Sequence, residues 1–263
     1  MLKLEQIKHR INKRPILILL HGKSIAELED NIIQMKDLDV CYCSINYFTL
    51  LEEHILNRID RRLDFVYDSS FIPVKYRQNF ECKYRIPRLR GFLDSSPEKF
   101  YVTTKGSLER MCLDTGNEEF IIKYENQIFL IDDLPFDLNA PNSAILLVGL
   151  CIAFEIPFIS LLGFDGFKGV VQEDLLQSYY KSDLYIKNHR YLSVGNLEPS
   201  LLSQETWNIE GKGMDVVQQY CRELGVFMPE IYNCSPSTIY TGLFDIITYK
   251  ILINKLKEKR WNK

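Results

Sequence analysis

The feature that most constrains this fold is the regular alternation of short apolar runs and amphipathic segments in the first third of the chain. Apolar runs over residues 16–20, 40–45 and 63–67 predict buried strands. The segments between them, residues 25–35 and 50–59, have the hydrophobic spacing of helices. Strands separated by helices of this length specify a parallel, doubly wound (Rossmann-like) α/β sheet with helices on both faces.

The pattern is looser between residues 71 and 139. There the segment "EEFIIKYENQIFLIDDLPFDLNAP" predicts short strands that end in an acidic turn. Regularity returns in "NSAILLVGLCIAFEIPFISLLGFDGF", which predicts a helix over 143–154 and a buried strand over 157–162.

The last hundred residues predict a less regular arrangement. We expect a polar, lid-like insertion over about 166–205, then a helix over 214–224 and a short strand in "EIYNCSPSTIY". A basic C-terminal helix is expected over about 240–263. No linker or repeat interrupts the chain, so we expect one domain over residues 1–263.

Composition excludes several classes of protein. The formal net charge of −3 argues against a surface that binds nucleic acid over the whole molecule. The seven cysteines include no Cys-x-x-Cys pair or Cys/His cluster with zinc spacing, so we expect no metal or other cofactor, and free thiols suit a reducing cytoplasm. The charged N-terminus is unlike a secretory signal, and no apolar window reaches the roughly 20 residues of a membrane span.

The predicted sheet gathers polar residues at one edge. Ligands of doubly wound sheets bind beyond the carboxyl ends of the strands, near the point where the strand order reverses. Hydroxyl, amide and carboxylate groups follow the predicted strands or begin the mid-chain helix, and glycines mark the turns between them. These residues are Gly22, Ser24, Ser44, Asn46, Asp68, Ser69, Asn142, Ser143, Gly163, Asp165, Asn233 and Ser235.

This set suits a nucleotide, because amides and hydroxyls can bind base and ribose while helix N-termini hold phosphate. Serine and asparagine also form turns and helix caps, so each position has an ordinary structural explanation as well. In particular, Asn142 and Ser143 could simply begin a helix.

Five stretches in the same order carry a resemblance to a known family. They are "ILLHGKS", "VCYCSINYF", "FVYDSS", "NSAILLVGLCIAFEIPFISLLGFDGF" and "MDVVQQYCRELGVFMPEIYNCSPST". Together they resemble the bacterial lipooligosaccharide sialyltransferases, whose superfamily also includes flagellin-modifying glycosyltransferases and an archaeal hydroxymethylpterin pyrophosphokinase. The resemblance implies a metal-independent, inverting transfer of sialic acid or a related sugar from a CMP-linked donor to a bacterial surface glycan.

The resemblance also implies roles for particular residues. Ser143 would contact the donor nucleotide, Ser44, Asn46 and Asp68 would lie near base or ribose, and Gly163 and Asp165 would line the pocket floor. The family's catalytic histidine corresponds to Val194, a departure from the pattern, and Phe167 replaces a tyrosine that binds phosphate.

An inverting transfer needs a base that takes the proton of the acceptor hydroxyl, and a histidine suits that work. His189 is the nearest histidine, and Asp165 is the alternative base. Two other functions stay open: a magnesium-dependent pyrophosphokinase of the pterin type, in which Asp68 and Asp165 hold the metal, and a non-catalytic nucleotide-binding relative.

Two basic segments have both a functional and a structural explanation. "KYRQNFECKYRIPRLR" could contact an anionic ligand or form a solvated surface. The tail "LFDIITYKILINKLKEKRWNK" could rest on the membrane that carries a lipid-linked glycan acceptor, or pack on the domain. Monomer and homo-oligomer both remain open.

Overall fold

The computed structural model describes residues 1–20, 23–45, 63–68, 86–113, 116–140, 142–165, 199–236, 238 and 240–258. The predicted helix over 50–59 lies outside these residues, as does the 166–198 part of the expected insertion.

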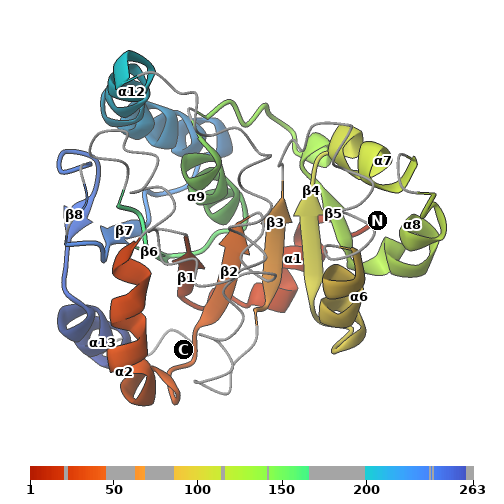
Figure 1. The fold of residues 1–263 in the computed structure, drawn as a ribbon, viewed down its shortest axis with the longest axis horizontal. Coiled ribbons are helices and arrows are strands. Elements are labelled where there is room, and N and C mark those ends of the chain that lie inside the picture. Colours follow the sequence, from red (N-terminus) through yellow and green to blue (C-terminus); the bar gives the residue numbers. More distant parts are fainter. Residues whose placement is uncertain are drawn as a thin grey trace.

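Eight parallel strands form one sheet, in the order β5-β4-β3-β2-β1-β6-β7-β8 (Figure 1). Every neighbouring pair is parallel, so the predicted doubly wound α/β sheet is confirmed. The strands are β1 (Ile16–Leu19), β2 (Cys41–Ile45), β3 (Phe65–Asp68), β4 (Phe100–Thr103), β5 (Ile128–Leu130), β6 (Phe158–Leu162), β7 (Glu230–Asn233) and β8 (Asp245–Ile246).

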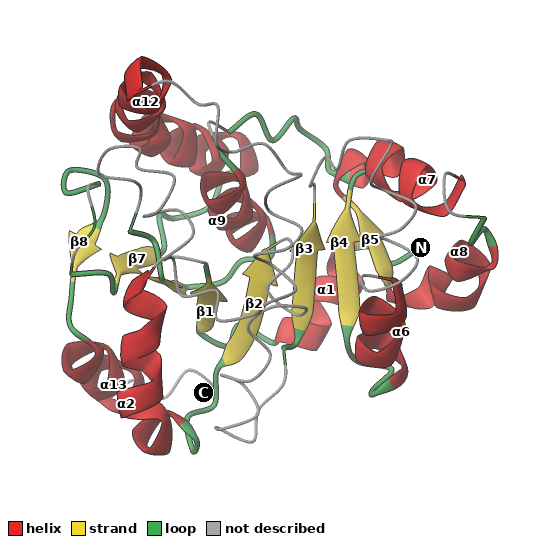
Figure 2. Ribbon diagram, in the orientation of Figure 1, coloured by secondary structure: helices red, strands yellow, loops and turns green. Residues whose placement is uncertain are grey.

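Helices cover both faces of this sheet (Figure 2). One apolar core joins the sheet to α1 (Leu4–Ile11), α9 (Ser143–Ala153) and α12 (Pro199–Leu224). The core on the other face joins it to α2 (Glu27–Met35), α6 (Ile86–Asp94), α7 (Lys105–Leu113), α8 (Glu119–Tyr124) and α13 (Tyr249–Glu258). Because both faces are covered, every residue of β1, β2, β3 and β6 is buried, which explains why these strands are mostly apolar.

The strand order reverses beside β1. From β1 the chain adds β2 to β5 in one direction, then returns to place β6 on the other side of β1. Ile16 of β1 is therefore in register with Cys41 of β2 on one side and Ile159 of β6 on the other. The carboxyl ends of β1 and β6 form the topological switch point where doubly wound proteins bind ligands.

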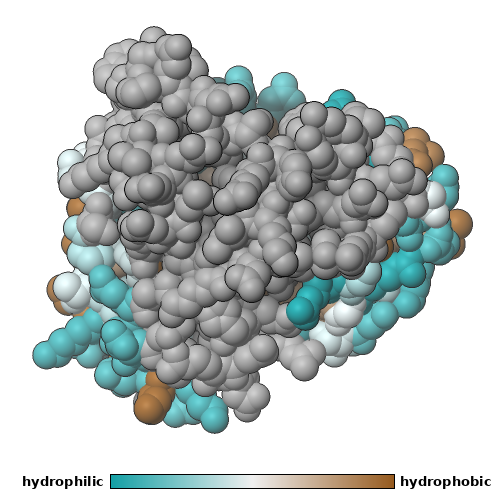
Figure 3. Space-filling model, viewed as in Figure 1, coloured by the Kyte–Doolittle hydropathy of each residue, from teal (hydrophilic) through white to brown (hydrophobic). Residues whose placement is uncertain are grey.

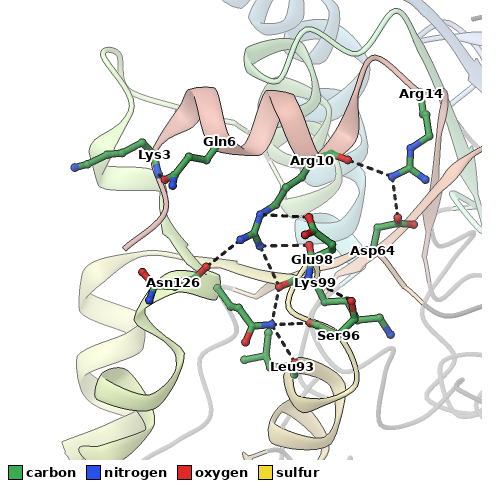
Figure 4. A network of polar contacts seen from close by, with 11 residues as sticks. Lys3, Gln6, Arg10, Arg14, Asp64, Leu93, Ser96, Glu98, Lys99 and Asn126 are labelled. Atoms are coloured by element: carbon green, nitrogen blue, oxygen red, sulfur yellow. Dashed lines mark hydrogen bonds and ion pairs between the residues drawn. The ribbon is translucent and has the colours of Figure 1, made fainter. Parts of the chain in front are cut away.

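The opposite, amino edge of the sheet is fastened by α1 (Figure 4). The Arg10 guanidinium donates to the carbonyl oxygens of Glu98, Lys99 and Asn126 at 3.2–3.5 Å. Nearby, the Gln127 side chain donates to the carbonyl oxygen of Lys99 as well and to two further carbonyl oxygens, at 2.9–3.0 Å. Apart from the bond to Asn126, which precedes β5, these bonds satisfy carbonyls of the segment that leads from α6 into β4, so they stabilise the fold at this edge.

Three sequence predictions were wrong in detail. The stretch expected to hold short strands after residue 118 contains β5 in its second half, but its first half forms α8, because Phe120 and Tyr124 lie four residues apart on one buried helical face. Residues 199–205 belong to α12 instead of the insertion, and the predicted helix over 214–224 is the second half of α12. The C-terminal helix begins at Tyr249, because Asp245 and Ile246 pair with β7 as strand β8.

Candidate functional site

Three loops meet at the switch point. They follow β1, β6 and β7 and carry Ser24, Asp165 and Ser235. All three residues are buried, and hydrogen bonds join Ser24 to each of the other two, although the sequence separates them widely. A helix that connects two parallel strands runs antiparallel to them, so its first residue lies at the carboxyl edge of the sheet. α9 therefore begins, with Ser143, at the same edge as these three loops.

The first contact joins a helix start to a carboxylate. The Ser24 amide donates to Oδ2 of Asp165 at 2.7 Å. Ser24 lies in the 3₁₀-helix η1 (Lys23–Ala26), which continues directly into α2, so its N–H belongs to the positive end of a helical segment. Asp165 is only 8% exposed, and its other oxygen, Oδ1, is buried with no hydrogen-bond partner among the described residues.

The second contact joins the loops after β1, β6 and β7. The Ser24 hydroxyl donates to Oγ of Ser235 at 2.8 Å, and the amide of Phe164 donates to the same oxygen at 2.7 Å. The side chain of Asn233 accepts from the Ser235 amide at 3.0 Å, as in an Asx turn, and thereby directs the serine inward.

The carbonyl of Phe164 is hydrogen-bonded, as its amide is. It accepts from the Thr238 hydroxyl at 2.7 Å and from the Asn233 amide group at 3.3 Å. The Phe164 ring stacks on Tyr240 with 4.6 Å between ring centroids. The backbone that carries Asp165 is therefore fixed by the loop after β7.

The surroundings of Asp165 are negatively charged. Burial, and then the nearby Asp165 and Asp30, raise the pKa of Glu27. Complete burial raises the pKa of Tyr249 far above its usual range, with smaller contributions from Cys234, Glu27 and Asp165. The Tyr249 hydroxyl also has no hydrogen-bond partner within the described part of the chain.

Two predicted residues lie on the other side of β1. Ser44 of β2 is in register with Leu19 of β1, fully buried, and its hydroxyl has no partner among the described residues. Asp68 ends β3 with 3% exposure, and its carbonyl accepts from the Thr103 hydroxyl at 2.9 Å. These residues stand along the same carboxyl edge as Asp165, separated from it by the central strand.

The remaining predicted residues have structural roles or lie outside the described ranges. Asn142 caps α9 through the 2.9 Å bond from the Ile145 amide to its side chain, as the structural explanation predicted. Gly163 turns the chain out of β6 at φ +80°. Gly22, Asn46 and His189 lie outside the described residues, as do Phe167 and Val194.

Sequence reasoning missed Thr238, Glu27 and Tyr249. The sequence does contain a pattern that indicates a role for Thr238, because "NCSPST" is rich in residues whose side chains form local hydrogen bonds. No sequence pattern indicates Glu27 or Tyr249. They interact only because α2 packs beside α13 in one core.

A hollow lies away from the switch point. It measures about 540 Å³, within the usual range for small-molecule sites, and opens between α12 and the β7–β8 edge of the sheet. Its apolar lining includes Met214, Met228, Ile231, Leu243, Phe244 and Ile246. None of the residues predicted from the sequence lines it.

The described residues contain no group of three or more His, Cys, Asp or Glu side chains that could hold a metal ion. Their six cysteines are all free and buried. No described helix combines the length and the apolarity needed to cross a membrane.

Where the structure describes the two basic segments, their residues make contacts within the domain. Arg90 lies on α6 and contacts Glu119 and Asn117. The apolar face of α13, which includes Leu252, Ile253 and Leu256, is buried in the core. Hydrophilic side chains dominate the visible surface where α2 and α13 lie (Figure 3).

Comparison of the chain with protein-family models, with curated proteins and with solved structures found no match. The structure itself defines an α/β protein with a doubly wound parallel sheet and a buried polar cluster at its switch point.

Proposed function

We propose that this chain is a glycosyltransferase that moves a sugar from a nucleotide-activated donor to a bacterial surface glycan with inversion. The donor is CMP-linked and carries sialic acid or a related sugar, and the acceptor is a glycan or lipid-linked glycan. The proposal includes a cytoplasmic location, at the inner face of the membrane, where such donors and acceptors meet.

One observation carries the proposal. The strand order reverses between β1 and β6, and the polar residues expected to bind a nucleotide follow those strands and their neighbours. Switch points of this kind are where doubly wound sheets bind nucleotides. Ser44, whose buried hydroxyl has no described partner, supplies an acceptor or donor for base or ribose.

The surroundings of Asp165 decide which role it takes and which role falls to His189. In a base-catalysed transfer, the group that takes the acceptor proton must reach the acceptor hydroxyl. Oδ2 of Asp165 already accepts a hydrogen bond from the Ser24 amide, so only Oδ1 is available to a ligand. His189 therefore remains the first choice for the base, with Asp165 as a positioning residue.

A ligand screen tests the proposal. Purified full-length protein is heated with CMP, CDP, UDP, GDP or ATP, each with and without Mg²⁺, because a ligand that binds only the native state raises the melting temperature. The expected result is a shift with CMP or CDP, followed by donor turnover with CMP-sialic acid. No shift with any nucleotide would overturn the proposal, and Mg²⁺-dependent consumption of ATP would favour the pyrophosphokinase.

Two matched variants locate the site. Ser143→Ala removes a half-buried hydroxyl at the carboxyl edge, and Ser96→Ala removes one of similar exposure at the amino edge. We expect the first to weaken nucleotide binding about 10-fold, the equivalent of one hydrogen bond of about 1.4 kcal/mol, and the second to leave it unchanged. Equal affinities would place the nucleotide elsewhere.

A further inference from the structure

The helical run that follows β1 already has a carboxylate of the protein, that of Asp165, at its N-terminus. Residues 23–35 form one continuous helical run from η1 through α2. In doubly wound folds, the amides at this position commonly receive a phosphate group. Here the Ser24 amide donates instead to Asp165, at 2.7 Å.

We propose that Asp165 is a specificity-determining residue that excludes phosphate from the turn after β1. Its carboxylate occupies the position that a phosphate would take, and the ligand presents a hydroxyl or ammonium group there instead. The consequence for the donor, whose phosphates then lie away from the turn after β1, rests on the proposed function. The exclusion of phosphate does not.

Burial makes this exclusion strong. Asp165 is 8% exposed, so water and salt screen its charge weakly. Ser24 is 5% exposed, so the hydrogen bond between them is not open to competition from solvent. A phosphate that approached this amide would meet a fixed negative charge at contact distance.

The arrangement cannot relax easily. Asp165 follows Phe164, whose amide and carbonyl are both hydrogen-bonded to the loop after β7. Ser24 is tied to that same loop through Ser235. Turning the carboxylate aside to admit a phosphate would break its bond to the Ser24 amide, and shifting its backbone would also break the bonds of Phe164 to the loop after β7.

Neighbouring acids add to the effect. Glu27 lies one turn further along the same helical run, and Asp165 and Asp30 both contribute to the raised pKa of its carboxyl. The carboxylate of Asp165, at the Ser24 amide, therefore has acidic neighbours on a helical run whose start would otherwise attract anions.

The second carboxylate oxygen of Asp165 indicates which chemical group can bind beside it. Oδ1 is buried and has no hydrogen-bond partner among the residues described. A buried carboxylate oxygen is stabilised by a donor, and an ionised carboxylate can only accept hydrogen bonds. A hydroxyl or ammonium group supplies that donor, whereas a fully ionised phosphate does not.

The test uses inorganic pyrophosphate as the probe and titration calorimetry as the measurement, on full-length protein. Asp165→Asn keeps the size of the side chain and removes its charge. We expect this variant to bind pyrophosphate at least 10-fold more tightly than the unmodified protein. Asp37→Asn removes the same charge beyond the other end of α2 and is expected to leave the affinity unchanged.

A second variant covers the case in which Asp165→Asn does not fold. Glu27→Gln removes a neighbouring charge without touching the Ser24–Asp165 hydrogen bond, and is expected to raise pyrophosphate affinity about 2- to 5-fold. Unchanged affinity in both folded variants, or tight binding by the unmodified protein, would overturn the inference. Tighter pyrophosphate binding by Asp165→Asn without any response to nucleotides would uphold the exclusion of phosphate and overturn only the proposed function.

Discussion

The hydroxyl groups of Ser24 and Ser235 lie 2.8 Å apart, although 211 residues separate them in the chain. Each belongs to a loop at the carboxyl edge of the sheet, and Ser235 also accepts from the amide of Phe164. One small side chain thus joins the ends of β1, β6 and β7. The stability of the switch point depends on it.

Ser235→Ala should destabilise the protein by about 1–3 kcal/mol, because it leaves the Phe164 amide and the Ser24 hydroxyl buried without their partner. Urea unfolding followed by circular dichroism measures the difference. Ser95→Ala, at an exposed position, is the control and should change stability by less than about 0.5 kcal/mol. Equal losses in the two variants would contradict the assigned role of Ser235.

Gly149→Ala should destabilise the contact between α9 and α12. A Cβ at this position would lie 2.6 Å from Cδ2 of the buried Tyr220 ring, so the ring or the helix would have to shift. Overpacking of this kind costs about 1–3 kcal/mol, measured as a lower melting temperature. Gly91→Ala, on an open face of α6, meets no atom within 4 Å and should stabilise the protein by up to about 1 kcal/mol. The same sign in both variants would contradict a tight α9–α12 contact.

Ser160→Ala and Ser44→Ala form a matched pair that separates stability from binding. Both hydroxyls are fully buried and have no hydrogen-bond partner in the described part of the chain. Removing either should raise the free energy of unfolding by about 1 kcal/mol. Only Ser44, near the carboxyl end of β2, is expected to contact a nucleotide, so only Ser44→Ala should weaken nucleotide binding. Equal nucleotide affinities would remove Ser44 from the site.

Asp64 should make stability depend on pH. Burial raises the pKa of its carboxyl above the ordinary value of 3.8, against the opposing effects of Arg14 and of the Tyr42 amide. A raised folded-state pKa means that this contribution to stability is fully present below the unfolded-state pKa and is lost as pH rises through the folded-state pKa. The difference in unfolding free energy between the unmodified protein and Asp64→Asn should therefore fall between about pH 4 and neutrality.

Asp94→Asn is the control with the opposite sign. A hydrogen bond from Lys123 lowers the pKa of Asp94, so its contribution is present above the unfolded-state pKa and is lost as pH falls through the folded-state pKa. Asp94 is exposed, so this contribution should be small. Urea unfolding at several pH values measures both variants, and parallel pH profiles would contradict the assignment for Asp64.

The sequence predicts the central fold well because its signals there are local. A fully buried parallel strand is mostly apolar, and β1, β2 and β6 have that composition. The helix start at Asn142 is equally local, since the cap and the capped amide are three residues apart. α8 was missed because two adjacent isoleucines favour a strand, whereas the burial of Phe120 and Tyr124 against the sheet decided for a helix.

The amino-acid sequence by itself determined the parallel sheet and which polar residues would follow its strands, because periodicity and turn chemistry act over a few neighbouring residues. Only the tertiary structure decided that Asp165 faces the Ser24 amide and that Ser235 joins Ser24 to Phe164. Those contacts depend on the order in which strands take their places in the sheet. That order follows from packing across the whole chain, and no local pattern encodes it.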